Sequence, residues 1–169
     1  PWDWQDDAGS RVGLVLYRAQ LQAGDTALAE CLNSNLRAAG LCPRLIWVSS
    51  LRDPAVQAGV ADLLSSQAVR LVITGTAFAS VRSEHAGLGS PLWKALDCPV
   101  LQLLNSGSSR AHWQQSSRGL EPLDLSLQVV MPELDARITT RTCSFREARQ
   151  PSAGLATAIP RQQPDADGI

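Results

Sequence analysis

The sequence predicts an α/β protein with a doubly wound, mostly parallel sheet of the Rossmann or flavodoxin type. Short apolar runs recur along the 169 residues, and amphipathic helical segments separate them. A nearly continuous apolar run is typical of a strand that is buried on both faces, as strands of parallel sheets are. We therefore expect about four parallel strands plus an edge strand, joined by right-handed crossovers.

Each of the first two predicted strands leads into a predicted helix. Residues 12–17 form the first apolar run, and Asp25 predicts the N-cap of the helix that follows. Residues 45–49 form the second run. Asp53 and Pro54 then predict the start of the second helix, because a capping acid precedes a proline at the first helical position.

The second half of the chain continues this alternation. Residues 70–74 and 100–104 are the third and fourth predicted strands, and residues 91–96 are a short helix between them. Residues 137–145 are β-rich and alternate in polarity, so we expect them to add the edge strand.

Residues 121–131 fit two patterns. Alternate residues are apolar, as in a strand, but Leu123 and Leu127 also lie on one face of a helix. We predict a helix, because Pro122 suits a first helical position and the segment is longer than an ordinary strand. Pro132 should kink or end this helix, since proline lacks a backbone donor.

The length of 169 residues and the change in composition near both ends of the sequence suggest one domain. Residues 11–147 are the predicted α/β domain, with a linker at residues 1–10 and a linker or the start of a next domain at residues 148–169. The first residue is proline and the last part is rich in Pro and Gln. We therefore expect a single-domain piece of a longer polypeptide.

The composition argues against several classes of partner. A formal net charge of -1 and a charged content of 18% leave no basic stripe, so we expect neither nucleic acid nor anionic lipid as a partner. No apolar run approaches the roughly 18 residues of a membrane span. The four cysteines form no CxxC pair, which favours reduced thiols in a cytoplasmic protein over a zinc cluster or a disulfide framework.

The sequence lacks the common motifs of nucleotide binding and acyl transfer. Neither GxxxxGK(S/T) nor GxGxxG follows a predicted strand, so the chain is not expected to bind ATP itself, and no GxSxG elbow occurs. His112 is expected on a surface helix. His85 lies in residues 83–89, a glycine-rich loop that is either a flap or simply solvated. We assign no catalytic residue and expect no cofactor in this chain.

Ligands of doubly wound sheets bind beyond the carboxyl ends of the strands. This rule selects Arg18, Thr76, Ser108 and Ser109 as substrate-binding residues, because they follow the first, third and fourth predicted strands. The hydroxyls can form neutral hydrogen bonds, and Arg18 can add a charge-assisted one. Alternatively, Ser108 and Ser109 only cap a helix.

Glu133 and Asp135 are candidate metal ligands. Hard divalent cations prefer oxygen ligands, and residues at i and i+2 share a side of an extended segment. Alternatively, Asp135 accepts backbone hydrogen bonds at a turn, while Glu133 pairs with Arg137 or another arginine.

Several stretches together carry a family resemblance. They are Tyr17-Arg18, Ala23-Gly24-Asp25-Thr26, Thr76-Ala77-Phe78, Ser108-Ser109-Arg110, Ser116-Ser117-Arg118-Gly119-Leu120 and Val129-Val130-Met131-Pro132-Glu133-Leu134-Asp135. From about residue 11 to about residue 145, the chain resembles the large subunit of the ATP-dependent cobaltochelatases, relatives of the magnesium chelatase H subunit. The sequence Tyr17-Arg18 resembles the cobalt branch more than the magnesium branch. Ala136 stands where the family would have glycine.

The resemblance implies a fragment of a tetrapyrrole-binding subunit that inserts Co²⁺ into a corrin ring of the hydrogenobyrinic acid a,c-diamide type, in cobalamin biosynthesis. Its partners would be the remaining domains of the same subunit, an AAA+ ATPase that uses ATP, and a companion chelatase subunit. The resemblance also implies Arg118 as a substrate-binding residue. The fragment alone should be inactive, because its two histidines are poorly placed for the chemistry.

Other functions remain open. Within the family, the alternative is an H-type subunit that inserts Mg²⁺ into protoporphyrin. Outside it, the same sheet edge could belong to a sensor module that binds a small polar ligand, or to a purely architectural domain.

Overall fold

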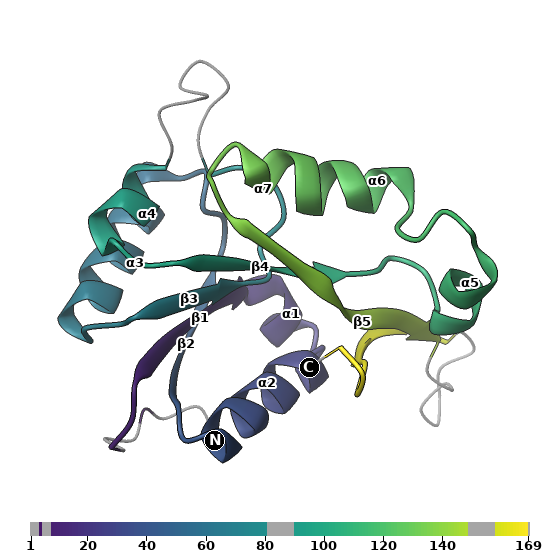
Figure 1. Ribbon diagram of the computed structural model, residues 1–169, viewed down its shortest axis with the longest axis horizontal. Coiled ribbons are helices and arrows are strands. Elements are labelled where there is room, and N and C mark those ends of the chain that lie inside the picture. Colours follow the sequence, from purple (N-terminus) through teal and green to yellow (C-terminus); the bar gives the residue numbers. More distant parts are fainter. Residues whose placement is uncertain (1–3, 5–7, 81–89, 149–157, 169) are drawn as a thin grey trace.

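The computed structural model describes residues 4, 8–80, 90–148 and 158–168 (Figure 1). These residues form one six-stranded sheet with the strand order β2-β1-β3-β4-β5-β6. The strands are β1 (Arg11–Tyr17), β2 (Cys42–Val48), β3 (Leu71–Thr74), β4 (Val100–Asn105), β5 (Ile138–Ala148) and β6 (Pro160–Pro164). The first five strands are parallel, and β6 is antiparallel to β5.

This order confirms the predicted doubly wound α/β fold in its flavodoxin-like form. The chain starts at β1, inside the sheet, moves outward to the edge strand β2, and then crosses back over β1 to β3. The direction of winding therefore reverses between β1 and β3. A reversal of this kind opens a crevice beyond the carboxyl ends of the two strands.

Helices cover both faces of the sheet (Figure 1). They are α1 (Arg18–Gln22), α2 (Ala27–Ala38), α3 (Pro54–Ser66), α4 (Pro91–Leu96) and α5 (Arg110–Gln115). On one face, Leu28 of α2 packs in a cluster with Leu14 of β1, and on the other, Leu64 of α3 packs in a cluster with Val15. Neighbouring strand residues point to opposite faces, so β1 contributes to two hydrophobic cores.

The two predicted helix starts have different outcomes. Asp53 caps α3 as predicted, because its Oδ1 accepts a hydrogen bond of 2.9 Å from the Ala55 N–H. The prediction that Asp25 caps α2 is wrong, since Thr26 holds the N-cap position without a side-chain cap. Asp25 Oδ1 instead accepts from the Gln162 N–H at 3.0 Å. It thereby satisfies a backbone donor of β6, which would otherwise be unpaired at the edge of the sheet.

The edge of the sheet is not where the sequence predicts it. β5 contains residues 138–145 of the segment predicted as the edge strand, yet it lies inside the sheet between β4 and β6. The true edge is β6, from a segment predicted as a linker or a next domain. Its residues Pro-Arg-Gln-Gln-Pro carry no apolar pattern, so the sequence offered no signal for a strand. Trp4, also predicted to lie in a linker, donates from its indole to the Leu45 carbonyl at 3.3 Å.

The segment with two possible patterns is a helix, as predicted. It consists of α6 (Pro122–Leu125), a π-helical turn η2 (Ser126–Val130) and α7 (Met131–Glu133). The helix passes through Pro132 and ends one residue later. The wide π turn ends two residues before Pro132, which has no N–H to donate the α-helical hydrogen bond to the turn.

Two further features bear on the predictions. The loop of residues 83–89, with His85, lies outside the described residues. Within the described ranges, no helix has the length and hydrophobicity needed to cross a membrane.

Candidate functional site

A buried ion pair lies beside the carboxyl end of β3. Arg137 Nη2 and Asp135 Oδ2 are 2.7 Å apart, and both side chains are fully buried. The pair is therefore shielded from solvent.

The turn after α7 positions both partners. The Arg137 N–H donates to the Pro132 carbonyl at 3.3 Å, and the Ala136 N–H donates to the Glu133 carbonyl at 3.0 Å. Ala136 has a φ of +59°, in the left-handed region that favours glycine. This residue stands where the family resemblance predicts glycine, and the backbone conformation supplies the physical reason for that preference.

Arg137 holds the loop that leaves β3. Its Nη1 donates to the Thr76 carbonyl and to Gln102 Oε1, both at 2.9 Å, and its Nη2 donates to the Phe78 carbonyl at 3.1 Å. The guanidinium also lies over the Trp93 ring, 5.4 Å from its centroid. Burial lowers the pKa of Arg137, and the charge of Asp135 acts in the opposite direction. An arginine remains protonated near neutral pH even so.

Asp135 binds the same loop at Ser80, two residues after Phe78. Its Oδ2 accepts from the Ser80 N–H at 2.6 Å and from the Ser80 hydroxyl at 2.8 Å, in addition to Arg137. The Ser80 hydroxyl lies 2.8 Å from the hydroxyl of Ser90, at the start of α4. A carboxylate with so many donors is satisfied without a metal ion. We name the two side chains of Asp135 and Arg137 the loop clamp.

Phe78 occupies an unusual backbone conformation within the clamped loop. Its φ is +65°, and its N–H donates to the Leu127 carbonyl of η2 at 2.9 Å. Its side chain is 40% exposed, whereas Thr76 and Ser80 on either side are buried. Tyr17, at the end of β1, donates from its hydroxyl to the Ala77 carbonyl at 2.9 Å. Burial raises the pKa of Tyr17, and the charge of Arg137 partly opposes this.

A second polar network lies at the carboxyl end of β4. The Asn105 N–H donates to Gln128 Oε1, and Gln128 Nε2 donates to the Asn105 carbonyl, both at 2.7 Å. Asp124 Oδ2 accepts from the Gly107 N–H at 2.7 Å. The side-chain amide of Gln128 therefore takes the place of a neighbouring strand and ties the helix to β4.

The predicted substrate-binding residues differ in exposure and in hydrogen-bond partners. Thr76 is buried in the clamped loop, and Arg18 is exposed at the start of α1. Ser109 caps α5 by accepting from the His112 N–H at 3.2 Å. The Ser108 N–H donates to Ser106 Oγ at 3.2 Å. Ser109 is therefore a helix cap, as the alternative interpretation of the sequence proposed.

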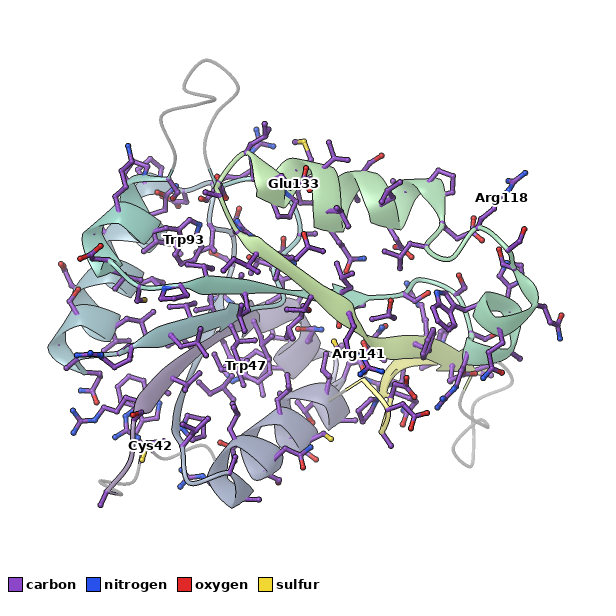
Figure 2. The ribbon with its side chains drawn as sticks, in the orientation of Figure 1. Cys42, Trp47, Trp93, Arg118, Glu133 and Arg141 are labelled. Atoms are coloured by element: carbon purple, nitrogen blue, oxygen red, sulfur yellow. The ribbon has the colours of Figure 1, made fainter. Side chains whose placement is uncertain are left out.

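Arg118 and Glu133 lie near opposite ends of the layer formed by α5, α6 and α7 (Figure 2). Arg118 is exposed and lines an open pocket of about 450 Å³ together with His112 and Glu121. Glu133 is exposed, whereas Asp135 is buried. Among the described residues, no three His, Cys, Asp or Glu side chains are grouped so that they could hold a metal ion. The substrate and metal roles assigned from the sequence stay predictions.

Sequence reasoning missed most of the clamped network. Gln102 was a usable signal, because a lone amide within the apolar run Val-Leu-Gln-Leu-Leu must find a buried partner. Arg137 and Ser80 gave no comparable signal, since they come together only through the folded chain. The left-handed conformation of Phe78 could not be anticipated, because large side chains seldom adopt it.

Comparisons with known proteins point to one family. The sequence profile described as CobN/Magnesium Chelatase matches residues 2–169. The chain is 39% identical over 137 residues to an aerobic cobaltochelatase subunit CobN of a Sinorhizobium species, covering 81% of this chain and 11% of that protein. It is 38% identical over 164 residues to CobN of Pseudomonas aeruginosa, covering 96% of this chain and 12% of that protein.

Two other similarities are weaker in sequence. The magnesium-chelatase subunit ChlH of Oryza sativa subsp. indica is 28% identical over 145 residues, covering 82% of this chain and 10% of that protein. The catalytic subunit of cobaltochelatase from Mycobacterium tuberculosis superposes with a TM-score of 0.78 at 26% identity, covering 98% of this chain and 14% of that structure. The chain thus spans about a tenth of the length of the curated relatives that it matches.

Proposed function

Because this chain belongs to the CobN/magnesium chelatase family, we propose that it is one domain of the large subunit of an ATP-dependent cobaltochelatase. That subunit inserts Co²⁺ into a corrin ring of the hydrogenobyrinic acid a,c-diamide type, a ligase reaction that forms nitrogen–metal bonds. Its setting is cobalamin biosynthesis in the cytoplasm. An AAA+ ATPase hydrolyses ATP and acts on the large subunit together with a companion chelatase subunit.

One observation favours cobalt over magnesium. The identity to the two CobN subunits is 39% and 38%, against 28% to the ChlH subunit of rice over a similar length. The solved structure that superposes on the chain is also a cobaltochelatase subunit.

In this proposal the domain forms one wall of the substrate cleft. Metal insertion requires removal of water from a hydrated dication and acceptance of two pyrrole protons. Asp135 is occupied by Arg137 and Ser80, so Glu133 is the more accessible of the two predicted metal ligands. A metal ion could reach Asp135 only after the loop clamp had opened.

The predicted substrate contacts divide by exposure. Arg18 and Arg118 are exposed guanidinium groups, which suit the peripheral carboxylates of a corrin ring. Thr76, Ser108 and Ser109 have hydrogen bonds within the chain, so they would shape the loops at the sheet edge and touch the substrate only at its margin.

Reconstitution tests this proposal. The complete large subunit that contains this domain is combined with its AAA+ and companion subunits, Mg²⁺-ATP, Co²⁺ and metal-free hydrogenobyrinic acid a,c-diamide. We expect an ATP-dependent change of the corrin absorption spectrum as cobalt enters. Insertion of Mg²⁺ into protoporphyrin by the same mixture, without cobalt insertion, would assign the chain to the magnesium branch and contradict the proposal.

A further inference from the structure

In its described part, residues 75–80, the loop after β3 presents one large apolar side chain to solvent. Thr76, Ala79 and Ser80 are 1%, 3% and 3% exposed, while the phenylalanine among them is 40% exposed. More than half of the surface of Phe78 is covered, and the rest of this large apolar residue is open to solvent and available for a contact.

The backbone at Phe78 is held in a costly conformation. A left-handed φ of +65° is sterically unfavourable for a residue with a large side chain. Its N–H is bound by the Leu127 carbonyl, and its carbonyl is bound by the buried guanidinium of Arg137. Strain that is retained by restraints on both sides of one residue is a recurrent feature of ligand sites.

The position of Phe78 is that of a ligand contact. It follows β3 at the reversal between β1 and β3, where doubly wound folds bind their ligands. On its β1 side, Tyr17 is fixed to the Ala77 carbonyl, and on its other side runs the helix that contains Leu127. That helix has few charges on its surface, its Val130 is 52% exposed, and Leu134 directly after it is 39% exposed.

We propose that Phe78 is a substrate contact that stacks on the conjugated face of the tetrapyrrole ring, with the loop clamp as the device that fixes its orientation. This inference rests on the proposed function and adds a binding residue to it. An aromatic face packs well on a flat π system when its direction is set in advance.

The test uses Phe78→Gly and Phe78→Trp in the complete large subunit. Binding of metal-free hydrogenobyrinic acid a,c-diamide is titrated by absorbance and by quenching of tryptophan fluorescence. We expect Phe78→Gly to raise the Kd by about tenfold, in the range found for loss of one stacking contact. Phe78→Trp should keep the Kd within about threefold, because it retains an aromatic face.

The melting temperature separates binding from folding. Glycine accepts a φ of +65° without strain, so Phe78→Gly should melt at the same temperature as the wild type or a few degrees higher. Leu63→Ala is the matched control, since Leu63 is 39% exposed near the end of α3, which leads into the amino end of β3, whereas Phe78 follows the carboxyl end of that strand. It should leave the Kd unchanged.

Several outcomes would overturn the inference. An unchanged Kd in Phe78→Gly would do so, and so would a lower rate of insertion at unchanged Kd, which would indicate a contact with another domain. A drop of several degrees in the melting temperature of Phe78→Gly would show that the Phe78 side chain stabilises the fold by packing. None of these results bears on the proposed function, which fails separately if the wild-type subunit binds the corrin but inserts no cobalt with its partners.

Discussion

Two arginine–aspartate sites in this domain have opposite surroundings. Arg137 is fully buried with Asp135, at 2.7 Å. The Arg110 side chain is 42% exposed and pairs with Asp165 and with Asp167, the latter at 2.7 Å. Burial lowers the pKa of Arg137, whereas hydrogen bonding to Asp167 raises the pKa of Arg110. The same two residue types therefore respond in opposite directions to their environment.

The difference shows what each pair contributes. Charges removed from water lose hydration, so a buried pair is kept only if every partner is in place. The loop clamp meets most of this condition, because its Nη and Oδ2 atoms bind Thr76, Phe78 and Ser80 and thereby fix the loop after β3, while Nε of Arg137 is buried without a hydrogen-bond partner. Arg110 is partly exposed, and its partner Asp167 is 74% exposed, so salt screens this site more than the loop clamp and its ion pairs tie the segment after β6 to α5 more weakly, although Asp165 itself is buried.

The largest expected effect follows loss of one clamp partner. Arg137→Met should lower the free energy of unfolding by about 3–5 kcal/mol, because Asp135 would be left buried without its cation. Urea unfolding followed by tryptophan fluorescence measures this change. A loss below about 1 kcal/mol would mean that the pair is solvated, contrary to its burial.

A second substitution sharpens this result. Asp135→Asn combined with Arg137→Met removes both charges, so the double variant should be more stable than the sum of the single changes predicts. Additive losses would indicate that the two side chains do not interact, which would contradict the loop clamp.

Burial should also make the fold sensitive to alkaline pH through Cys143. Burial is the main cause that raises the pKa of this thiol from 9.0 to about 11. Its contribution to stability is complete below pH 9 and is lost as the pH rises toward 11, up to about 3 kcal/mol. Unfolding curves of the wild type should therefore decline more steeply over this range than those of Cys143→Ser. The pKa of Tyr17 is also raised by burial, but its contribution to stability falls with pH equally in both proteins. Parallel curves would therefore contradict the assignment to Cys143.

The turn inside the loop clamp can be improved. Ala136 has a φ of +59°, so Ala136→Gly should raise the free energy of unfolding by about 0.5–1 kcal/mol. Ala39→Gly is the matched control, because Ala39 caps α2 at a φ of -80°, where glycine has no advantage. Equal effects of the two changes in a thermal melt would contradict the left-handed turn.

The smallest effect is expected at the partly exposed site of Arg110. Arg110→Ala should change stability by a small fraction of the loss in Arg137→Met, and the change should shrink as salt is added. Denaturation at low and high NaCl measures both quantities. A loss as large as that of Arg137→Met, unaffected by salt, would remove the distinction between the two sites.

The parallel core could be predicted because its signal is local. Each of the first four strands is an apolar run, and Asp53 followed by Pro54 predicts the start of α3. β6 escaped prediction because an edge strand need not be apolar: its backbone pairs with β5, and Asp25 satisfies its Gln162 N–H. A strand of this kind is defined by its neighbours rather than by its own residues.

The site was predicted only in part for a related reason. Thr76 and Asp135 follow from sheet topology and from the turn after the helix, and both lie in the clamped network. Their connection depends on Arg137, which reaches across 61 positions of the chain to Thr76. Nothing in the local sequence distinguishes a buried arginine of this kind from a solvated one.

The most direct test of the loop clamp is native-state hydrogen exchange at the amides of Phe78 and Ser80. In the wild type these amides are bound by the Leu127 carbonyl and by Asp135, so they should exchange slowly. In Arg137→Met the amides of Phe78 and Ser80 should both exchange faster than global unfolding alone explains. The amides of β1 should exchange only at the rate that the lower global stability of the variant sets. Rapid exchange of Phe78 and Ser80 in the wild type would contradict the account, because it would show a loop that the buried pair does not hold.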